Sequence, residues 1–327
     1  MNDRRILSDD FVESLTGGML SPILDFVRKD STLDIEIRNK YINIYYRGGN
    51  LIKITEIKQG VLYEFKFDIK YSKATNLHTY DELRKKNIVF VSSPEGVCTW
   101  VNAIPKIKHA IDFFLGSSKE KNEREFQQLI VRENNYSKIA NSTDYFILDI
   151  EYTNSDSREA RFDMIAMKWP STSATRKLSN GFLPTLAFIE VKYGDDALVG
   201  KSDIKSHIRH MEKFLEDRIK FESLKAEMVE VFKMKRRLKL IKFGKKGGNN
   251  HEISSFSGDV KPEYILLLIN HDPACSKLNN AKLKPMKNAE LKFAVSTFMG
   301  YGLYNESIFS LDEFKERFKK QFCSNIN

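Results

Sequence analysis

One stretch of the chain, residues 183–193 (LPTLAFIEVKY), constrains the fold more than any other. It is a short, mostly apolar run between turn-forming residues, which is the pattern of a buried β-strand. Glu190 and Lys192 interrupt the run near its C-terminal end, and because side chains alternate along a strand, both point to the same face. Burying a carboxylate and an ammonium lowers stability unless the two groups pair with each other or bind a ligand. The sequence therefore predicts that this strand carries either an ion pair or a functional site.

The Glu-x-Lys spacing is not informative by itself, because it occurs five times in the chain, at Glu56, Glu64, Glu190, Glu290 and Glu313. Around Glu64, charged and apolar residues alternate strictly, which is typical of an amphipathic strand with one solvated face. Only at Glu190 do the charges interrupt a run that is apolar on both faces. The context, and not the tripeptide, therefore singles out Glu190 and Lys192.

The segments around residues 183–193 predict a mixed α/β domain. Further apolar runs have the length and composition of strands, at residues 145–152, 161–169, 264–270 and within 291–304. Helical patterns begin near residue 118 and cover residues 201–217, 221–240 and 311–322. The order of the central elements is therefore helix, three strands, helix and strand.

Residues 1–116 have a different pattern and predict a separate, strand-rich α+β domain. Strands are expected within residues 33–46, with a turn near Asn39, and at 51–57 and 61–71, and helices at 81–86 and 101–114. Gly116 and the two serines after it mark the boundary, so that residues 117–327 form the second domain. The first domain shows no catalytic constellation, and a role in binding a partner protein or in forming a homo-oligomer is left open.

The composition narrows the class of protein. The 327 residues are enough for two domains, and a net charge of +9 favours an anionic partner such as nucleic acid, although basic proteins are common. The three cysteines form no CxxC motif, so neither a zinc site nor a disulfide framework is indicated, and a reducing, cytoplasmic setting fits. The chain contains no apolar run of the roughly 20 residues needed to span a bilayer, and we expect no membrane partner.

Asp163 is a further acid within an apolar strand, and a hairpin would place it beside Glu190 and Lys192. Two carboxylates and a backbone carbonyl, here that of Val191, are hard oxygen ligands suited to Mg²⁺ or Mn²⁺. The metal would activate a water molecule, which Lys192 would orient while it stabilises charge on a phosphate. A structural ion pair between Asp163 and Lys192 is the alternative. The sequence favours the catalytic interpretation, because buried ionisable clusters often mark functional sites.

This ordered set of elements and residues resembles the core of the PD-(D/E)XK nuclease superfamily, which includes type II restriction endonucleases, RecB-like nucleases and many prokaryotic defence nucleases. The resemblance covers roughly residues 118–272, and Phe162 stands where the motif has proline. It implies a restriction-endonuclease-like mixed sheet flanked by helices. It also implies a Mg²⁺-dependent nuclease that hydrolyses phosphodiester bonds, with DNA as the favoured substrate and anti-phage defence as a setting.

Carried over residue by residue, the resemblance makes Asp163 and Glu190 the metal-binding acids and Lys192 the catalytic lysine. Many members also use a glutamate on the first helix, and Glu123 is the choice here, ahead of Glu125. An acid in the first turn of a helix is equally well explained as a capping residue. His207, on the helix after the motif, takes the position of a phosphate- or base-contacting group, with an ordinary surface histidine as the alternative.

A basic insertion at about residues 221–260 is the last candidate for function. Residues 233–246 contain eight lysines and arginines and no acid, which favours contact with phosphates over a merely solvated helix end. The residues expected to bind nucleic acid are Lys235, Arg236, Arg237 and Lys239.

Two other functions are left open by the sequence. One is a catalytically inactive nuclease-fold module that binds nucleic acid or a partner protein. The complete set of Asp163, Glu190 and Lys192 argues against it, because an inactive copy has no physical need to keep buried charges. The other is a structural subunit whose basic surface meets an acidic protein. A steep loss of binding with salt would distinguish nucleic acid from such a partner.

Overall fold

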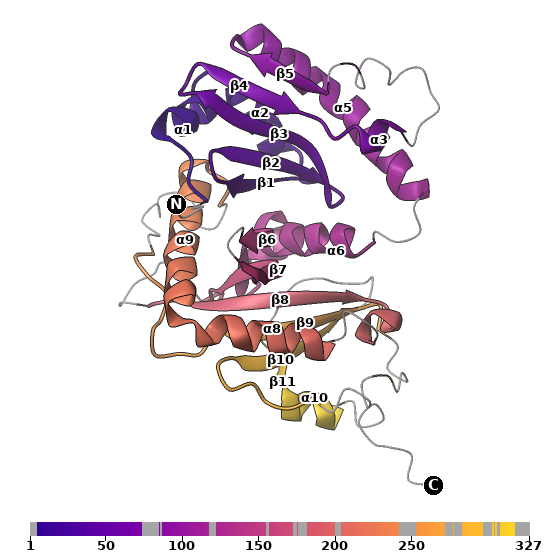
Figure 1. Cartoon of the computed structure of the whole chain (residues 1–327), viewed down its shortest axis with the longest axis vertical. Coiled ribbons are helices and arrows are strands. Elements are labelled where there is room, and N and C mark those ends of the chain that lie inside the picture. The colour runs from indigo at the N-terminus through magenta and orange to yellow at the C-terminus, as the bar shows by residue number, and fades with distance from the viewer. Residues whose placement is uncertain are drawn as a thin grey trace. The chain divides into compact units, whose positions relative to one another are not determined.

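A computed structural model describes residues 5–73, 85, 87–117, 122–154, 157–172, 175, 182–199, 204–241, 253–271, 277, 283–296, 303, 305 and 308–317. The chain forms two compact units (Figure 1). The first consists of Met1–Arg132 and Glu230–Lys242, and the second of Glu133–Val229 and Phe243–Asn327. The predicted boundary at residues 116 and 117 is therefore not where the structure divides the chain.

The first unit contains a five-stranded antiparallel sheet whose strands are neighbours in chain order (Figure 1). The strands are β1 (Leu33–Arg38), β2 (Tyr41–Tyr46), β3 (Gly49–Lys58), β4 (Leu62–Lys66) and β5 (Ile88–Val91). The helices are α1 (Asp9–Thr16), α2 (Ser21–Lys29), α3 (Lys70–Lys73), α5 (Pro94–Ser117) and α6 (Asn122–Val131). The predicted strands within residues 33–46 and at 51–57 are confirmed, whereas the strand predicted at 61–71 ends at Lys66. The predicted helix at 101–114 lies inside α5, and most of the helix predicted at 81–86 lies outside the described residues.

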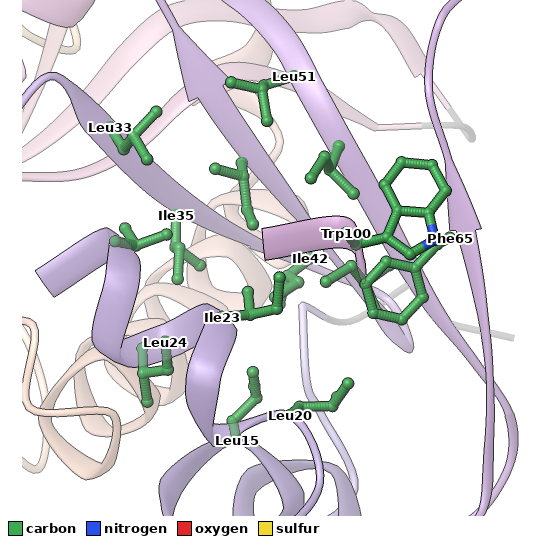
Figure 2. Close-up of a cluster of buried hydrophobic side chains, with 14 of the residues drawn as sticks. Leu15, Leu20, Ile23, Leu24, Leu33, Ile35, Ile42, Leu51, Phe65 and Trp100 are labelled. Atoms are coloured by element: carbon green, nitrogen blue, oxygen red, sulfur yellow. The ribbon is translucent and has the colours of Figure 1, made fainter. Parts of the chain in front are cut away.

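Alternation along the strands gives this sheet its core face. Ile35, Ile42 and Phe65 are fully buried and pack with side chains from α1, α2 and α5 (Figure 2). The ring of Phe65 lies 5.4 Å from that of Trp100 in α5, measured between centroids. Each fully buried large apolar side chain contributes about 1.5 to 3 kcal/mol, so this one cluster accounts for a large part of the stability of the unit.

The packing of helix α6 explains why the first unit extends beyond the predicted boundary at residue 116, as far as Arg132. Its Gln128 side chain donates to the carbonyl oxygens of Thr32 and Tyr45, at 2.8 and 3.0 Å, and accepts from the amide of Gly48 at 2.7 Å. A Cβ atom on Gly48 would lie 2.4 Å from the backbone of Arg124 in α6, so only glycine permits this approach. The helix that the sequence assigns to the second domain thus packs on the first unit.

The second unit contains a six-stranded sheet in the order β11-β10-β9-β8-β7-β6 (Figure 1). The strands are β6 (Tyr145–Asn154), β7 (Ser157–Lys168), β8 (Thr185–Tyr193), β9 (Glu263–Ile269), β10 (Glu290–Ser296) and β11 (Ile308–Ser310). β6, β7 and β8 are antiparallel neighbours, β8, β9 and β10 run parallel, and β11 is antiparallel to β10. All the predicted strands of this domain are present, and the mixed α/β class is confirmed.

Helices and short turns complete the second unit. They are Arg132–Tyr136 (a π-helix), the 3₁₀ turns Lys138–Asn141 and Asp195–Leu198, α8 (Ile204–Glu216), α9 (Arg218–Arg237) and α10 (Leu311–Arg317). α9 is one continuous helix whose residues from Glu230 onward belong to the first unit. Helix α8 covers the sheet at β7 and β8, where the Phe214 ring lies 5.1 Å from that of Phe162 and 6.2 Å from that of Phe188. Among the described helices, none is both long and apolar enough to cross a membrane.

Candidate functional site

The candidate site lies where strands β7 and β8 separate. Their paired register ends at Met164 and Ile189, while β8 continues to pair with β9 as far as Tyr193. Asp163 is the first β7 residue beyond this pairing. Its Oδ2 accepts a hydrogen bond of 2.9 Å from the amide of Val191, so a carboxylate takes the place of a strand carbonyl. The peptide that it contacts is the one that joins Glu190 to Val191.

Glu190 and Lys192 lie on the same face of β8, as predicted from their spacing, and they form an ion pair with each other. Lys192 Nζ lies 2.7 Å from Glu190 Oε1, and the two residues are only 6% and 5% exposed. Asp163, Glu190 and Lys192 therefore converge near the C-terminal end of β8. Asp163 is the less buried of the two acids, which leaves it at the edge of the cluster.

His207, in the first turn of α8, is a direct partner of this cluster. Its Nδ1 lies 2.8 Å from Glu190 Oε1, and its Nε2 accepts from Lys192 Nζ at 3.3 Å. The sequence predicts that His207 contacts substrate. The structure shows it in contact with the acid and the lysine of the site, and its contact with substrate stays a prediction.

These contacts fix the charge of the carboxyl group. Burial raises the pKa of Glu190, but the hydrogen bond from His207 and the charge of Lys192 outweigh it, and the pKa lies below its ordinary value of 4.5. Glu190 is thus a carboxylate at neutral pH although it is buried. A carboxylate in this state is a ligand for a cation or a base, and it is not an acid.

Tyr264 in β9 is a member of the site that sequence reasoning missed. It is 2% exposed, and its strand neighbour across the β8–β9 register is Phe188. Burial, with the negative charges of Glu190 and Asp163, raises the pKa of Tyr264 well above its ordinary value of 10. The signal in the sequence is the single hydroxyl in the otherwise apolar run of residues 264–269.

The donor set suits a hard cation better than zinc. Asp163, Glu190 and the Val191 carbonyl are all oxygen donors, and Mg²⁺ commonly binds to one or two carboxylates while it keeps several waters. Within the described parts of the chain, no group of three or more His, Cys, Asp or Glu side chains has the arrangement of a metal site. A closed, all-protein metal cage is therefore not formed by these residues, whereas an open two-carboxylate site fits them.

Glu123 and the cluster belong to different units of the structure, so its role at the site stays a prediction. It lies in the first turn of α6, which belongs to the first unit, whereas Asp163, Glu190 and Lys192 belong to the second. The resemblance assigns Glu123 to the site because many members of the superfamily use a glutamate on the first helix, here α6. That helix packs on β2, and Glu125, the less favoured choice, forms an ion pair of 2.7 Å with Arg47.

The predicted role of Lys235 in binding nucleic acid is wrong. Its side chain is 0% exposed and pairs with Glu36, also 0% exposed, at 3.1 Å. Arg237 remains exposed but pairs with Asp9 at 2.8 Å, and Arg236 also has partners within the chain. Lys239 is exposed, so it keeps the predicted role as an expectation. The lysines at 242, 245 and 246 lie outside the described residues.

A second buried carboxylate, Glu263, holds together four strands of the same sheet. Its Oε1 lies 2.9 Å from Lys168 Nζ and 2.8 Å from Lys292 Nζ, and its Oε2 accepts from the Tyr145 hydroxyl at 2.6 Å. Burial raises the pKa of Glu263, but these partners outweigh it, and the pKa falls below its ordinary value of 4.5.

Acid should therefore weaken the second unit through Glu263. A folded-state pKa below 4.5 means that the stabilisation is present above that pH and is lost as the pH falls through the folded value. We expect Glu263→Gln to be less stable than the parent at neutral pH and the difference to shrink below about pH 4.5, in urea unfolding from pH 7 to 3. Glu290→Gln, which removes the half-exposed partner of Lys292, is the matched control and should change little. A constant difference across the pH range would contradict the interpretation.

Comparisons of the chain with protein-family models, with curated proteins and with solved structures found no match. The function is therefore inferred from the residues of the site and from their geometry. The Asp163 carboxylate of one strand contacts the peptide of Glu190 in the next, and a lysine and a histidine of the same unit contact the Glu190 carboxylate.

Proposed function

We propose that this chain is a metal-dependent nuclease that hydrolyses phosphodiester bonds in nucleic acid, with DNA as the favoured substrate. The observation that carries the proposal is the hydrogen bond that the Asp163 carboxylate accepts from the amide of Val191. This amide belongs to the peptide between Glu190 and Val191, directly before Lys192. The order of elements in the second unit adds support: strand β6, β7 with its aspartate, β8 with Glu-x-Lys, helix α8 and strand β9. This is the order expected of a restriction-endonuclease-like core after its first helix.

In this proposal, the carboxylates of Asp163 and Glu190 and the carbonyl of Val191 hold Mg²⁺ or Mn²⁺, which supplies a water of lowered pKa. Glu190 is suited to that task because it is ionised while buried. His207 keeps its carboxylate oriented, as outer partners of metal ligands commonly do. The low exposure of the cluster strengthens its electrostatic interactions, since little water screens them.

Lys192 has two tasks in sequence. Without a cation it balances the charge of Glu190 at 2.7 Å. With a divalent cation held by the two carboxylates, the Lys192 ammonium would orient the attacking water and stabilise the charge that develops on the phosphate oxygen. This second role is a physical reason to keep a lysine, and not an apolar residue, at this buried position.

The experiment that tests the proposal is incubation of the purified full chain with supercoiled plasmid and with linear DNA, in Mg²⁺, in Mn²⁺ or in EDTA. We expect cleavage in either metal and none in EDTA. The ratio of nicked to linear products and the trimming of linear ends separate endonuclease from exonuclease action. Binding of DNA without cleavage in both metals would overturn the proposal and indicate a binding module, and the same assay on single-stranded DNA and RNA defines the substrate.

A further inference from the structure

Strands β8 and β9, which lie side by side and run parallel, leave the sheet in the same way. Gly194 and Asn270 follow them directly, with φ of +70° and +52°, and the amide of Gly194 donates to the carbonyl of Ile269 at 2.9 Å. These two left-handed residues turn the chain at the same level. Asp195 and His271 come next, so the geometry places an acid and an imidazole together at the carboxyl edge of the sheet.

The two side chains are joined by a short hydrogen bond between His271 Nδ1 and Asp195 Oδ1. The His271 side chain is 1% exposed and that of Asp195 is 18% exposed. Since Nδ1 faces the carboxylate, Nε2 is the nitrogen left over, and it is buried without a hydrogen-bond partner among the described residues. An unpaired buried polar atom lowers stability. Joining the two loops through His271 therefore costs stability that a purely apolar contact would not cost.

The position of the pair matters because β8 has lost support on its other side. Beyond Ile189 the strand no longer pairs with β7, so within the described residues the segment that carries Glu190 and Lys192 has β9 as its only strand neighbour. Asp163 secures this segment at Val191, in its middle. The bond from Asp195 to His271 secures it at its end, three residues after Lys192.

We propose that Asp195 and His271 are positioning residues for the site: the pair clamps the end of β8 to the end of β9 and so fixes Glu190 and Lys192. This inference rests on the proposed nuclease function for its kinetic consequence, but the clamp itself is a property of the strand ends. The pair acts through the backbone of β8, and neither side chain needs to touch the substrate. A displacement of a catalytic group by about 1 Å can cost a hundredfold in rate.

Three single variants of the full chain test this proposal. Asp195→Ala removes the acceptor of the His271 hydrogen bond, and Asp195→Asn keeps an acceptor oxygen in its place. Asp196→Ala is the matched control, because Asp196 lies in the same 3₁₀ turn but its side chain is 99% exposed and pairs with Lys277 at the surface.

Two measurements are made on each variant. Amide hydrogen exchange over residues 188–194 should become about tenfold faster in Asp195→Ala, because the end of β8 opens more often, and should stay near the parent rate in Asp195→Asn and Asp196→Ala. For DNA cleavage in Mg²⁺, kcat should fall about tenfold to a hundredfold in Asp195→Ala with KM nearly unchanged. Asp195→Asn should restore most of it.

Unchanged exchange over residues 188–194 in Asp195→Ala would overturn the clamp. A loss of kcat that is equal in Asp195→Ala and Asp195→Asn would also overturn it, because the charge and not the bond would then matter. If the parent chain cleaves no nucleic acid, the exchange measurement still decides whether the clamp exists, and that failure concerns the nuclease function alone.

Discussion

Replacing Lys235 with methionine should lower the free energy of unfolding by about 3 to 5 kcal/mol. This loss is large for a residue of the basic segment 233–246, whose sequence predicts exposure to solvent. Methionine fills a similar volume but leaves the Glu36 carboxylate buried without its ammonium, which lies 3.1 Å away in the parent. Arg38 Nη1 is 4.0 Å from the other carboxylate oxygen, too far to replace the lost contact. The measurement is urea unfolding of parent and variant, with the midpoint and the slope compared.

Lys233→Met is the matched control for this prediction. Lys233 lies in the same helix, but it is 43% exposed and pairs with Glu230 within the helix, so its loss should cost less than about 1 kcal/mol. Combining Lys235→Met with Glu36→Leu should recover most of the stability, because an apolar pair replaces a buried ion pair at little cost. Equal midpoints for the parent and Lys235→Met would contradict the buried pairing.

For activity, the largest loss that leaves metal binding intact is expected from Lys192→Met. Cleavage should fall at least about a hundredfold, because the variant lacks the ammonium that stabilises charge on the phosphate. Mn²⁺ binding, followed by calorimetry, should persist, since Asp163 and Glu190 remain. The apo chain should lose less stability than Lys235→Met does, because Glu190 retains a second partner, His207 Nδ1 at 2.8 Å.

The chain supplies its own control for this variant in another Glu-x-Lys of the same sheet. Lys292 in β10 pairs with Glu290 at 3.1 Å and with Glu263 at 2.8 Å, but it lies on a different strand from the candidate site. Lys292→Met should therefore change stability and leave the cleavage rate within a few-fold of the parent.

Glu190→Gln should lose both metal binding and cleavage. A large drop in the melting temperature of Lys192→Met with cleavage near the parent rate would favour a purely structural ion pair.

The elements of the second unit were predictable because their signals are local. An apolar run such as residues 264–269 is buried on both faces, and period-2 alternation puts Glu190 and Lys192 on the same face whatever surrounds them. The spacing of Asp163 from this strand predicts a hairpin. It does not predict that β7 and β8 would separate at Asp163, and therefore the contact with the Val191 amide was not foreseen.

The errors came from interactions that are distant in sequence. The helix that carries Glu123 was assigned to the second domain, but the contacts of Gln128 with Thr32 and Tyr45 fix α6 on the first unit. Lys235 was assigned by the number of charges around it. Its position in the helical period was the better signal, because it stands four residues after buried Val231 and three before buried Leu238, on the apolar stripe.

The first unit is assembled from two segments that are far apart in the chain, and this has a consequence during synthesis. Residues 230–242 leave the ribosome only after strands β6, β7 and β8 of the second unit have been made. Until then the nascent first unit lacks the Lys235 ammonium that lies beside the buried Glu36 carboxylate. Domains usually fold in the order of their synthesis, but here the first unit is completed only after a large part of the second has been made. A chaperone that holds nascent chains would accordingly find the core of the first unit without Met234, Leu238 and Leu240 for the time needed to translate about a hundred residues.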